Sequence, residues 1–306
     1  MAQPVRSWLN FALAQAPGVY ARLLGCRRRA DHEKLAFLAI VRRGDVVFDV
    51  GANTGYHTLL FSHLVGRRGQ VHAFEPVPPT FGILEANVKR ERHFDNVALN
   101  NCALAATDDS LPLFVPGSDY GQASIARHGA GSWAAPQKIV TYTCRATTVD
   151  AYLGAYDLQP PSFVKCDVEG AELRVLTGAV DTLRKLPPLL SLEVNADWTR
   201  SLGYEPHDLV RFLAGFGYCR FLLVDGRIRV LDDPGRELAA LAGSANLICA
   251  VPEIHGARLR RLLATVSRAE AKRRAVPASG PGASPAAAPD RGRDRAARMS
   301  RCCGAM

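Results

Sequence analysis

The stretch VVFDVGANTGYHTLLFSHLVG, residues 46–66, runs from an apolar segment through small residues into a second apolar segment. The first segment predicts a buried strand, and the second predicts a helix that begins at about Tyr56. Gly51 and Gly55 have no side chain beyond hydrogen, so they allow positive φ angles and the close approach of a ligand. The first N–H groups of a helix are unpaired donors that favour a polar or anionic group. The junction therefore predicts a cofactor-binding loop.

The spacing of the glycines restricts the type of cofactor. A dinucleotide fingerprint, G-x-G-x-x-G, needs glycine where this chain has Asn53 and Tyr56. What remains is D-x-G-x-x-x-G, with Asp49 two residues before Gly51. S-adenosylmethionine (SAM), with its positive ammonium and sulfonium and no pyrophosphate, suits this arrangement. Two alternatives stay open: a strand–helix turn that merely needs glycine, and a nucleotide-dependent oxidoreductase, which the missing glycines disfavour.

A second acidic residue follows at an informative interval. The segment QVHAFEP, residues 70–76, predicts a short strand that ends in Glu75, because Pro76 cannot continue a ladder. In doubly wound α/β folds, a carboxylate about 20 residues beyond the glycine loop binds the ribose hydroxyls of a nucleoside. Glu75 stands 20 positions after Gly55. We therefore predict that Glu75 binds ribose; the alternative is a solvated loop carboxylate.

Strand-like and helix-like segments alternate along the middle of the chain. Short apolar runs that alternate with longer helical runs favour a parallel sheet with helices on both faces. The sequence thus predicts an α/β, doubly wound, mostly parallel seven-stranded sheet, whose last two strands form an antiparallel edge. The segment 106–147 breaks the alternation and is predicted to be a hairpin insertion.

Charge is distributed unevenly along the chain. Residues 251–306 carry twelve Arg or Lys and four Asp or Glu, a surplus of eight in a chain of net charge +9. We predict a helical arm over 1–31, a folded domain over 32–252, and a basic tail over 253–306 that begins as a helix and then becomes disordered. Such a tail could make weak contacts with an anionic membrane or nucleic acid, although it has no aromatic residue for base stacking.

Cysteine usage and hydropathy bear on the compartment. The chain has eight cysteines and no C-x-x-C pair, which favours reduced thiols in a cytoplasmic protein over disulfides or a zinc site. No run of 18 apolar residues is present, so no membrane span is expected. The N-terminal SWLNFALAQA imitates a signal peptide, but its apolar stretch is short and broken by Asn10.

Six segments together resemble the FkbM-type family of SAM-dependent methyltransferases. They are VFDVGANTGYHTLLFS, HAFEPVPPTFGILEANV, VALNNCAL, TTVDAYL, FVKCDVEGAELRVLTGA and LSLEVN. The resemblance covers roughly residues 32–252, and DVEGAE is its most specific piece. It implies a Rossmann-like methyltransferase domain, SAM as the methyl donor, and usually O-methylation of a sugar, polyketide or similar hydroxylated acceptor. The arm, the insertion and the basic tail lie outside the match, and no particular acceptor follows from it.

The resemblance implies a cofactor site formed by Asp49, Gly51, Asn53, Gly55, Glu75, Asn101 and Cys102. Asp49 would bind the SAM ammonium directly or through water, and the loop after it would line the methionine. Glu75 would bind the ribose hydroxyls. The Asn101 amide and the Cys102 backbone N–H would bind adenine, although a strand-end amide that caps the backbone is a comparable interpretation of Asn101.

Carboxylates after two later strands are the candidate catalytic residues: Asp167 and Glu169 in CDVEG, and Glu193 in LEVN. Methyl transfer to a hydroxyl requires alignment of oxygen, methyl and sulfur and removal of the hydroxyl proton. A carboxylate near the acceptor oxygen could take that proton, as could a divalent metal ion held by two or three carboxylates. Glu169 could instead cap the following helix, and Lys165 could pair with Asp167.

Two histidines are further candidate bases. His57 opens the helix after the glycine loop, and His128 lies in a glycine-flanked part of the insertion. An alternative from a different class is a catalytically silent SAM-binding module that acts through its basic tail.

Overall fold

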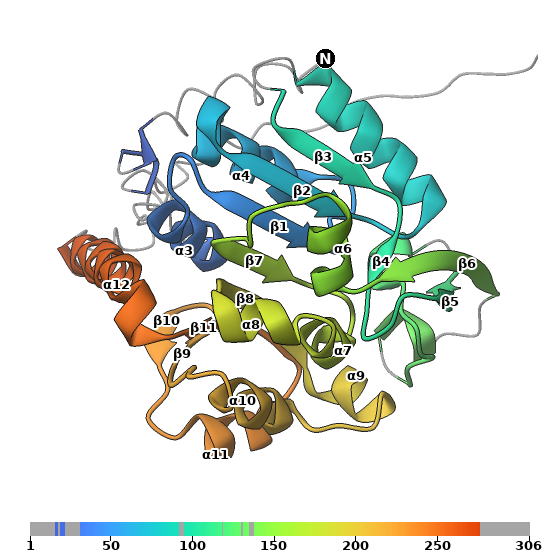
Figure 1. Cartoon of the computed structure of the whole chain (residues 1–306). Coiled ribbons are helices and arrows are strands. Elements are labelled where there is room, and N and C mark those ends of the chain that lie inside the picture. Colours follow the sequence, from blue (N-terminus) through green and yellow to red (C-terminus); the bar gives the residue numbers. More distant parts are fainter. Residues whose placement is uncertain are drawn as a thin grey trace, which may run out of the picture.

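The computed structural model describes residues 16–17, 19–21, 31–91, 95–117, 119–129, 131–134 and 138–275. A central eight-stranded sheet has the order β10-β9-β11-β8-β7-β1-β2-β3 (Figure 1). Its strands are β1 (Val46–Val50), β2 (Gln70–Phe74), β3 (Val97–Asn100), β7 (Phe163–Cys166), β8 (Leu189–Asn195), β9 (Arg220–Val224), β10 (Ile228–Val230) and β11 (Ser244–Ala250).

The strand directions divide this sheet into two parts. Strands β3, β2, β1, β7 and β8 pair in parallel, and β11, β9 and β10 continue the sheet in antiparallel pairs. The doubly wound α/β prediction is confirmed, but the count of seven strands is wrong. The additional strand, β10, has only three residues, which are too few for an alternation of hydrophobic and polar residues to be recognised in the sequence. Chain order reverses between β1 and β7, which is where doubly wound folds bind ligands.

Helices cover both faces of the sheet. One face carries α3 (His32–Ile40), α4 (Tyr56–Val65), α5 (Pro78–Arg90) and α12 (Pro252–Ala275); the other carries α6 (Val149–Ala155), α7 (Glu172–Thr177), α8 (Val180–Lys185), α10 (Pro206–Ala214) and α11 (Pro234–Ala239). Helix α9 (Ala196–Ser201) follows β8 directly. Successive side chains of a strand point to opposite faces of the sheet. Val47 thus packs in the cluster with α3 and α4, while Phe48 packs in the cluster with α6.

A second, three-stranded sheet lies beside the first. It consists of β4 (Ala103–Leu104), β5 (Ser110–Pro116) and β6 (Ile139–Thr147), in the order β4-β6-β5. Strands β5 and β6 are antiparallel and belong to the segment predicted as an insertion. Leu113 and Val115 of β5 pack on Val77, which follows β2. The second sheet therefore lies at the carboxyl ends of the central parallel strands (Figure 1).

Helix α12 packs against α3 and closes the core at that side. Leu259, Leu262 and Val266 are buried in the same cluster as the α3 side chains. Arg258 donates two hydrogen bonds to the Asp45 carboxylate, at 2.6 and 2.8 Å. Within the described ranges, none of the helices is both long and apolar enough to cross a bilayer. Most of the predicted N-terminal arm, and the tail after residue 275, lie outside the described residues.

Candidate functional site

The loop after β1 is shaped by residues with positive φ angles, which are 77° at Gly51, 49° at Asn53 and 90° at Gly55. A Cβ atom at Gly51 would lie 1.8 Å from the carbonyl oxygen of Asp167. A Cβ at Gly55 would lie 2.6 Å from Cδ1 of Leu84 in α5. Gly51 is therefore required by close packing against backbone as well as by its own conformation, and Gly55 is favoured by its positive φ angle.

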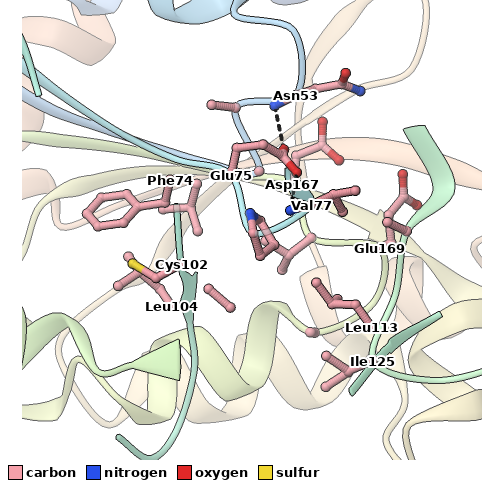
Figure 2. Close-up of a pocket in the computed structure, with 18 of the residues that line it drawn as sticks. Asn53, Phe74, Glu75, Val77, Cys102, Leu104, Leu113, Ile125, Asp167 and Glu169 are labelled. Carbon is pink, nitrogen blue, oxygen red and sulfur yellow. Dashed lines mark hydrogen bonds between the residues drawn. The ribbon is translucent and has the colours of Figure 1, made fainter. Parts of the chain in front are cut away.

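Glu75 follows β2 and is bonded to the glycine loop. Its Oε2 accepts a hydrogen bond from the Asn53 N–H at 2.8 Å, and its Oε1 accepts one from the Val77 N–H at 2.9 Å (Figure 2). The side chain is buried. Burial raises the pKa of Glu75 to about 7, although the two N–H bonds oppose the rise. Each carboxylate oxygen has a second lone pair, so Glu75 can also accept bonds from a ligand.

A cavity of about 270 Å³ lies between this loop and the second sheet. Six of the ten predicted site residues line it: Gly51, Asn53, Glu75, Cys102, Asp167 and Glu169. Figure 2 shows Glu75, Asp167 and Glu169 in its upper half and the apolar Leu113 and Ile125 below them. The residues that line the cavity do not include Asp49, Gly55, Asn101 or Glu193.

The side chains of Asp49 and Asn101 make hydrogen bonds to other groups of the protein. Asp49 is fully buried, and its Oδ2 accepts a hydrogen bond from the Thr58 hydroxyl at 2.6 Å. Burial raises the pKa of Asp49. The Asn101 side-chain amide donates to the carbonyl oxygen of Glu75 at 2.8 Å, so it holds the chain after β2. Contact of Asp49 with a ligand ammonium, or of Asn101 with adenine, stays a prediction.

The three candidate catalytic carboxylates come together because β7 and β8 are parallel neighbours. Asp167, Glu169 and Glu193 each place one oxygen within 4.8 Å of the others. The Lys165 ammonium donates to Asp167 Oδ2 at 2.9 Å, so the pairing expected from the sequence is present. The Ser244 hydroxyl donates to Glu193 Oε1 at 2.8 Å.

These carboxyl groups differ in charge. Burial alone would raise the pKa of Asp167, but the Lys165 ammonium and a hydrogen bond from Glu193 lower it to about 2. Burial, together with the hydrogen bond to Asp167, raises the pKa of Glu193 to about 9. Burial and the charge of Asp167 raise the pKa of Glu169 to about 10. At neutral pH Asp167 is therefore the ionised member of the three.

The loop that carries Glu169 is held from several sides. Glu169 has a φ of 55°, which is uncommon for a residue with a side chain. The Ser124 hydroxyl donates to its carbonyl oxygen at 3.0 Å, and the Tyr204 hydroxyl donates to the next carbonyl, that of Gly170, at 2.7 Å. Ala171 is the N-cap residue of α7 and no side chain caps this helix, so the alternative role of Glu169 as a cap is not observed.

The two candidate histidines lie in different surroundings. His57 lines the cavity, and burial and the Lys165 charge lower its pKa to about 3, so its imidazole is neutral. His128 is buried and stacks on Trp198 with 5.1 Å between ring centroids. It is not among the residues that line the cavity. His57 thus remains near the site, whereas His128 packs behind the Glu169 loop.

Phe74 and Pro76, which the sequence suggests as apolar walls around a nucleoside, line the cavity, but the part of the apolar wall that the insertion supplies was not identified from the sequence. Leu111, Leu113, Ala123 and Ile125 of the insertion supply it. The alternation in LPLFVP signals a half-buried strand. That signal does not say what the strand covers, because the contact joins segments far apart in the chain.

Comparison with known proteins adds to this geometry. The chain is 31% identical over 210 residues to the 31-O-demethyl-FK506 methyltransferase FkbM of Streptomyces tacrolimicus, with 58% of this chain and 74% of that protein covered. It is 28% identical over 173 residues to the hexuronic acid methyltransferase AglP of Haloferax volcanii, with 56% of this chain and 62% of that protein covered.

The chain also resembles a solved structure and matches a domain family. The methyltransferase FkbM of Methylobacillus flagellatus aligns with a TM-score of 0.41 and 15% identity, covering 75% of this chain and 58% of that one. The family described as the Methyltransferase FkbM domain matches residues 49–219. That match spans more than half of the chain and includes the glycine loop, Glu75 and the segment with Asp167 and Glu169. The chain therefore belongs to the FkbM methyltransferase family.

Proposed function

We propose that the chain is a SAM-dependent O-methyltransferase that acts on a hydroxyl group of a small molecule or glycan. The observation that carries the proposal is the cavity that Glu75 and the glycine loop share with the Asp167 and Glu169 carboxylates. One part of such a cavity suits a nucleoside and the other suits a polar reacting group. The names of two relatives, a 31-O-demethyl-FK506 methyltransferase and a hexuronic acid methyltransferase, agree with a hydroxylated acceptor.

SAM, when bound, supplies a methyl group on a positively charged sulfur. Glu75 would accept hydrogen bonds from the two ribose hydroxyls, and the Cys102 backbone N–H would bond the adenine base. Gly51 and Asn53 leave room for the methionine part. Asp167 and Glu169 line the same cavity, so they would be available to orient an acceptor beside the bound cofactor, and such orientation can supply a large part of the rate enhancement.

Asp167 is the residue that we propose as the hydrogen-bond partner of the acceptor hydroxyl. It is ionised, so it accepts a hydrogen bond from the hydroxyl and draws the proton away as the oxygen attacks. Glu169 and Glu193 are protonated at neutral pH and can donate hydrogen bonds to other oxygens of the acceptor. Asp167, Glu169 and Glu193 each offer one oxygen within 4.8 Å of the others, so they would hold a hard divalent cation if Glu169 and Glu193 released their protons. A metal requirement stays a prediction.

Two measurements test the proposal. Isothermal titration with SAM, S-adenosylhomocysteine (SAH) and NAD should show binding of the first two and none of NAD. Incubation with methyl-labelled SAM and a panel of neutral glycans, uronic acids and macrolide alcohols should then label at least one acceptor on oxygen, seen as a gain of one methyl group by mass spectrometry. Binding of NAD in place of SAM would support the oxidoreductase alternative, and SAM binding with no transfer to any hydroxyl would support the silent module.

A further inference from the structure

Lys165 is a buried cation beside the cavity. It lies on β7 directly opposite Asp49 of β1, and its side chain is only 3% exposed. Its ammonium donates to Asp167 Oδ2 at 2.9 Å. Burial disfavours the charged form of Lys165, but the charges of Asp167 and Asp49 outweigh burial and raise its pKa. Lys165 and Asp167 thus form a partly buried ion pair.

The position of Asp167 relative to the glycine loop determines which part of a bound cofactor lies near the Lys165–Asp167 ion pair. Gly51 lies so close to Asp167 that a Cβ atom would strike the Asp167 carbonyl oxygen. Asp167 and Lys165 line the same cavity as Glu75, Gly51 and Asn53. A sulfur between a ribose at Glu75 and a methionine along Gly51 and Asn53 would therefore lie beside the ion pair. This step rests on the proposed function. It brings the sulfur within range of one negative and one positive side chain.

We propose that Lys165 and Asp167 together set the preference of the cavity for SAM, which carries a sulfonium, over the neutral product SAH. Asp167 attracts the sulfonium, and Lys165 is a positioning residue that holds the Asp167 carboxylate in place and limits the strength of that attraction. Interactions between unit charges a few ångströms apart at a partly buried site are large enough to change a binding constant at least tenfold.

The charge balance of the reaction explains why such a pair would be useful. During transfer the sulfur–carbon bond breaks, its electron pair stays on sulfur, and a new carbon–oxygen bond forms. The sulfur loses its positive charge, and the acceptor hydroxyl releases one proton, which Asp167 receives before passing it to solvent. Attraction between Asp167 and the cofactor ends at that moment, so SAH and the methylated product can leave.

The test compares the affinities of SAM and SAH, because the two differ only in one methyl group and one charge. The ratio of SAM to SAH affinity, measured by isothermal titration, should fall about tenfold in Asp167→Asn, since Lys165 then repels the sulfonium without compensation. In the double variant Lys165→Met/Asp167→Asn the ratio should recover at least threefold relative to Asp167→Asn. A purely structural role of Lys165 would weaken both ligands together and leave the ratio unchanged.

Glu75→Gln is the matched control, because it changes the contact with the ribose that SAM and SAH share. It should weaken both ligands and leave their ratio within twofold of the wild-type value. If the ratio of SAM to SAH affinity is the same in the wild type and in Asp167→Asn, the inference is overturned. If this ratio is the same in the single and the double variant, the proposed role of Lys165 is overturned. Absence of SAM binding to the wild type would instead contradict the proposed function.

A second comparison needs no variant and therefore does not depend on how the substitutions fold. Sinefungin resembles SAH but carries an amine, and so a positive charge, near the position of the sulfur. The wild-type protein should bind sinefungin several-fold more tightly than SAH. Equal affinities for these two ligands would contradict the proposed role of the ion pair.

Discussion

Glu75 illustrates how one side chain can serve the fold and the site together. Its two oxygens hold the N–H groups of Asn53 and Val77, so it fixes the glycine loop relative to the end of β2. The same carboxylate lines the cavity. A substitution at Glu75 will therefore affect both ligand binding and stability, and the two effects must be measured separately.

Glu75→Ala should weaken SAM binding by about 2 kcal/mol or more, roughly thirtyfold, because two charge-assisted hydrogen bonds to the ribose are lost. It should also lower the free energy of unfolding by about 1–3 kcal/mol, since the buried Val77 N–H and the partly buried Asn53 N–H lose their acceptor. Isothermal titration and urea unfolding measure the two effects. Wild-type affinity in this variant would remove Glu75 from the cofactor site.

The affinity for SAM should also depend on pH through Glu75. Its pKa of about 7 in the ligand-free protein means that the carboxyl is increasingly protonated as pH falls below 7, whereas the ionised form is the better acceptor for ribose. Affinity should thus rise with pH up to about 7, approaching tenfold per pH unit on the acidic side, and then level off.

Titrations with SAM from about pH 5.5 to 8.5, which bracket that pKa, measure this dependence. In Glu75→Gln the part of the slope that arises from Glu75 should disappear. This control is needed because burial also raises the pKa of Glu33, a residue of α3 outside the cavity lining, to about 7. An identical slope in the variant would show that another group titrates.

At the scale of elements, the junction of β1 and α4 is tightly packed against the loop after β7. The contact between Gly51 and Asp167 leaves no room for a side chain. The second sheet closes the other side, with Leu113 and Ile125 on the cavity and Ser124 bonded to the Glu169 carbonyl oxygen. The site is therefore formed by loops that follow different strands. The pairing of those strands fixes the positions of the loops relative to one another.

Gly51→Val should abolish measurable SAM binding and lower the melting temperature, because the new side chain must displace the Asp167 backbone. Gly82→Ala is the matched control: Gly82 lies inside α5, and a Cβ atom added there would meet nothing within 4 Å. That change should leave SAM affinity unaltered and stabilise the protein by roughly 0.5–1 kcal/mol. Unaltered SAM binding in Gly51→Val would contradict the assignment of the cofactor loop.

At the scale of the whole molecule, the basic C-terminal segment divides into two parts. The first, α12, belongs to the folded body, because Leu259, Leu262 and Val266 are buried beside α3. Residues 276–306 contain prolines at 277, 281, 285 and 289 among small residues, a composition that offers little apolar surface to bury. We propose that the boundary of the folded body lies near Ala275.

A chain that ends at Ala275 should keep the melting temperature and SAM affinity of the full chain. A chain that ends at Val251 should melt several degrees lower, because it loses the buried face of α12 and the Arg258 bonds to Asp45. Calorimetry of the three proteins distinguishes these outcomes. A large loss of stability on removal of 276–306 would place part of that segment on the catalytic body.

The same truncated chain tests the proposed contacts with anionic partners. Truncation at Ala275 removes five Arg and two Asp, a net charge of +3 out of the surplus of +8 beyond Ala250. Binding to anionic vesicles or to nucleic acid should weaken with added salt and should be weaker still after truncation at Ala275. Binding that neither salt nor truncation changes would exclude an electrostatic role for the tail.

Features that depend on neighbours along the chain could be predicted from the sequence. The end of β1 and the start of α4 follow from the hydrophobic pattern and from the glycines between them. The position of Glu75 follows from its spacing after the glycine loop. All of these signals lie close together in the sequence. The resemblance to the FkbM family, confirmed by the domain match, likewise rests on short segments. Even the pairing of Lys165 with Asp167 could be expected, because residues two apart in a strand share a face.

Tertiary structure alone decided which of these residues meet and which carry charge. The strand order β8-β7-β1 brings Glu193 to Asp167 and Asp49 to Lys165, and no local pattern specifies that order. The wall from the insertion and the burial of Asp49 are likewise contacts between distant segments. Protonation follows burial and neighbouring charges, which exist only after folding, so the sequence could name three carboxylates but could not tell that Asp167 is the one held ionised.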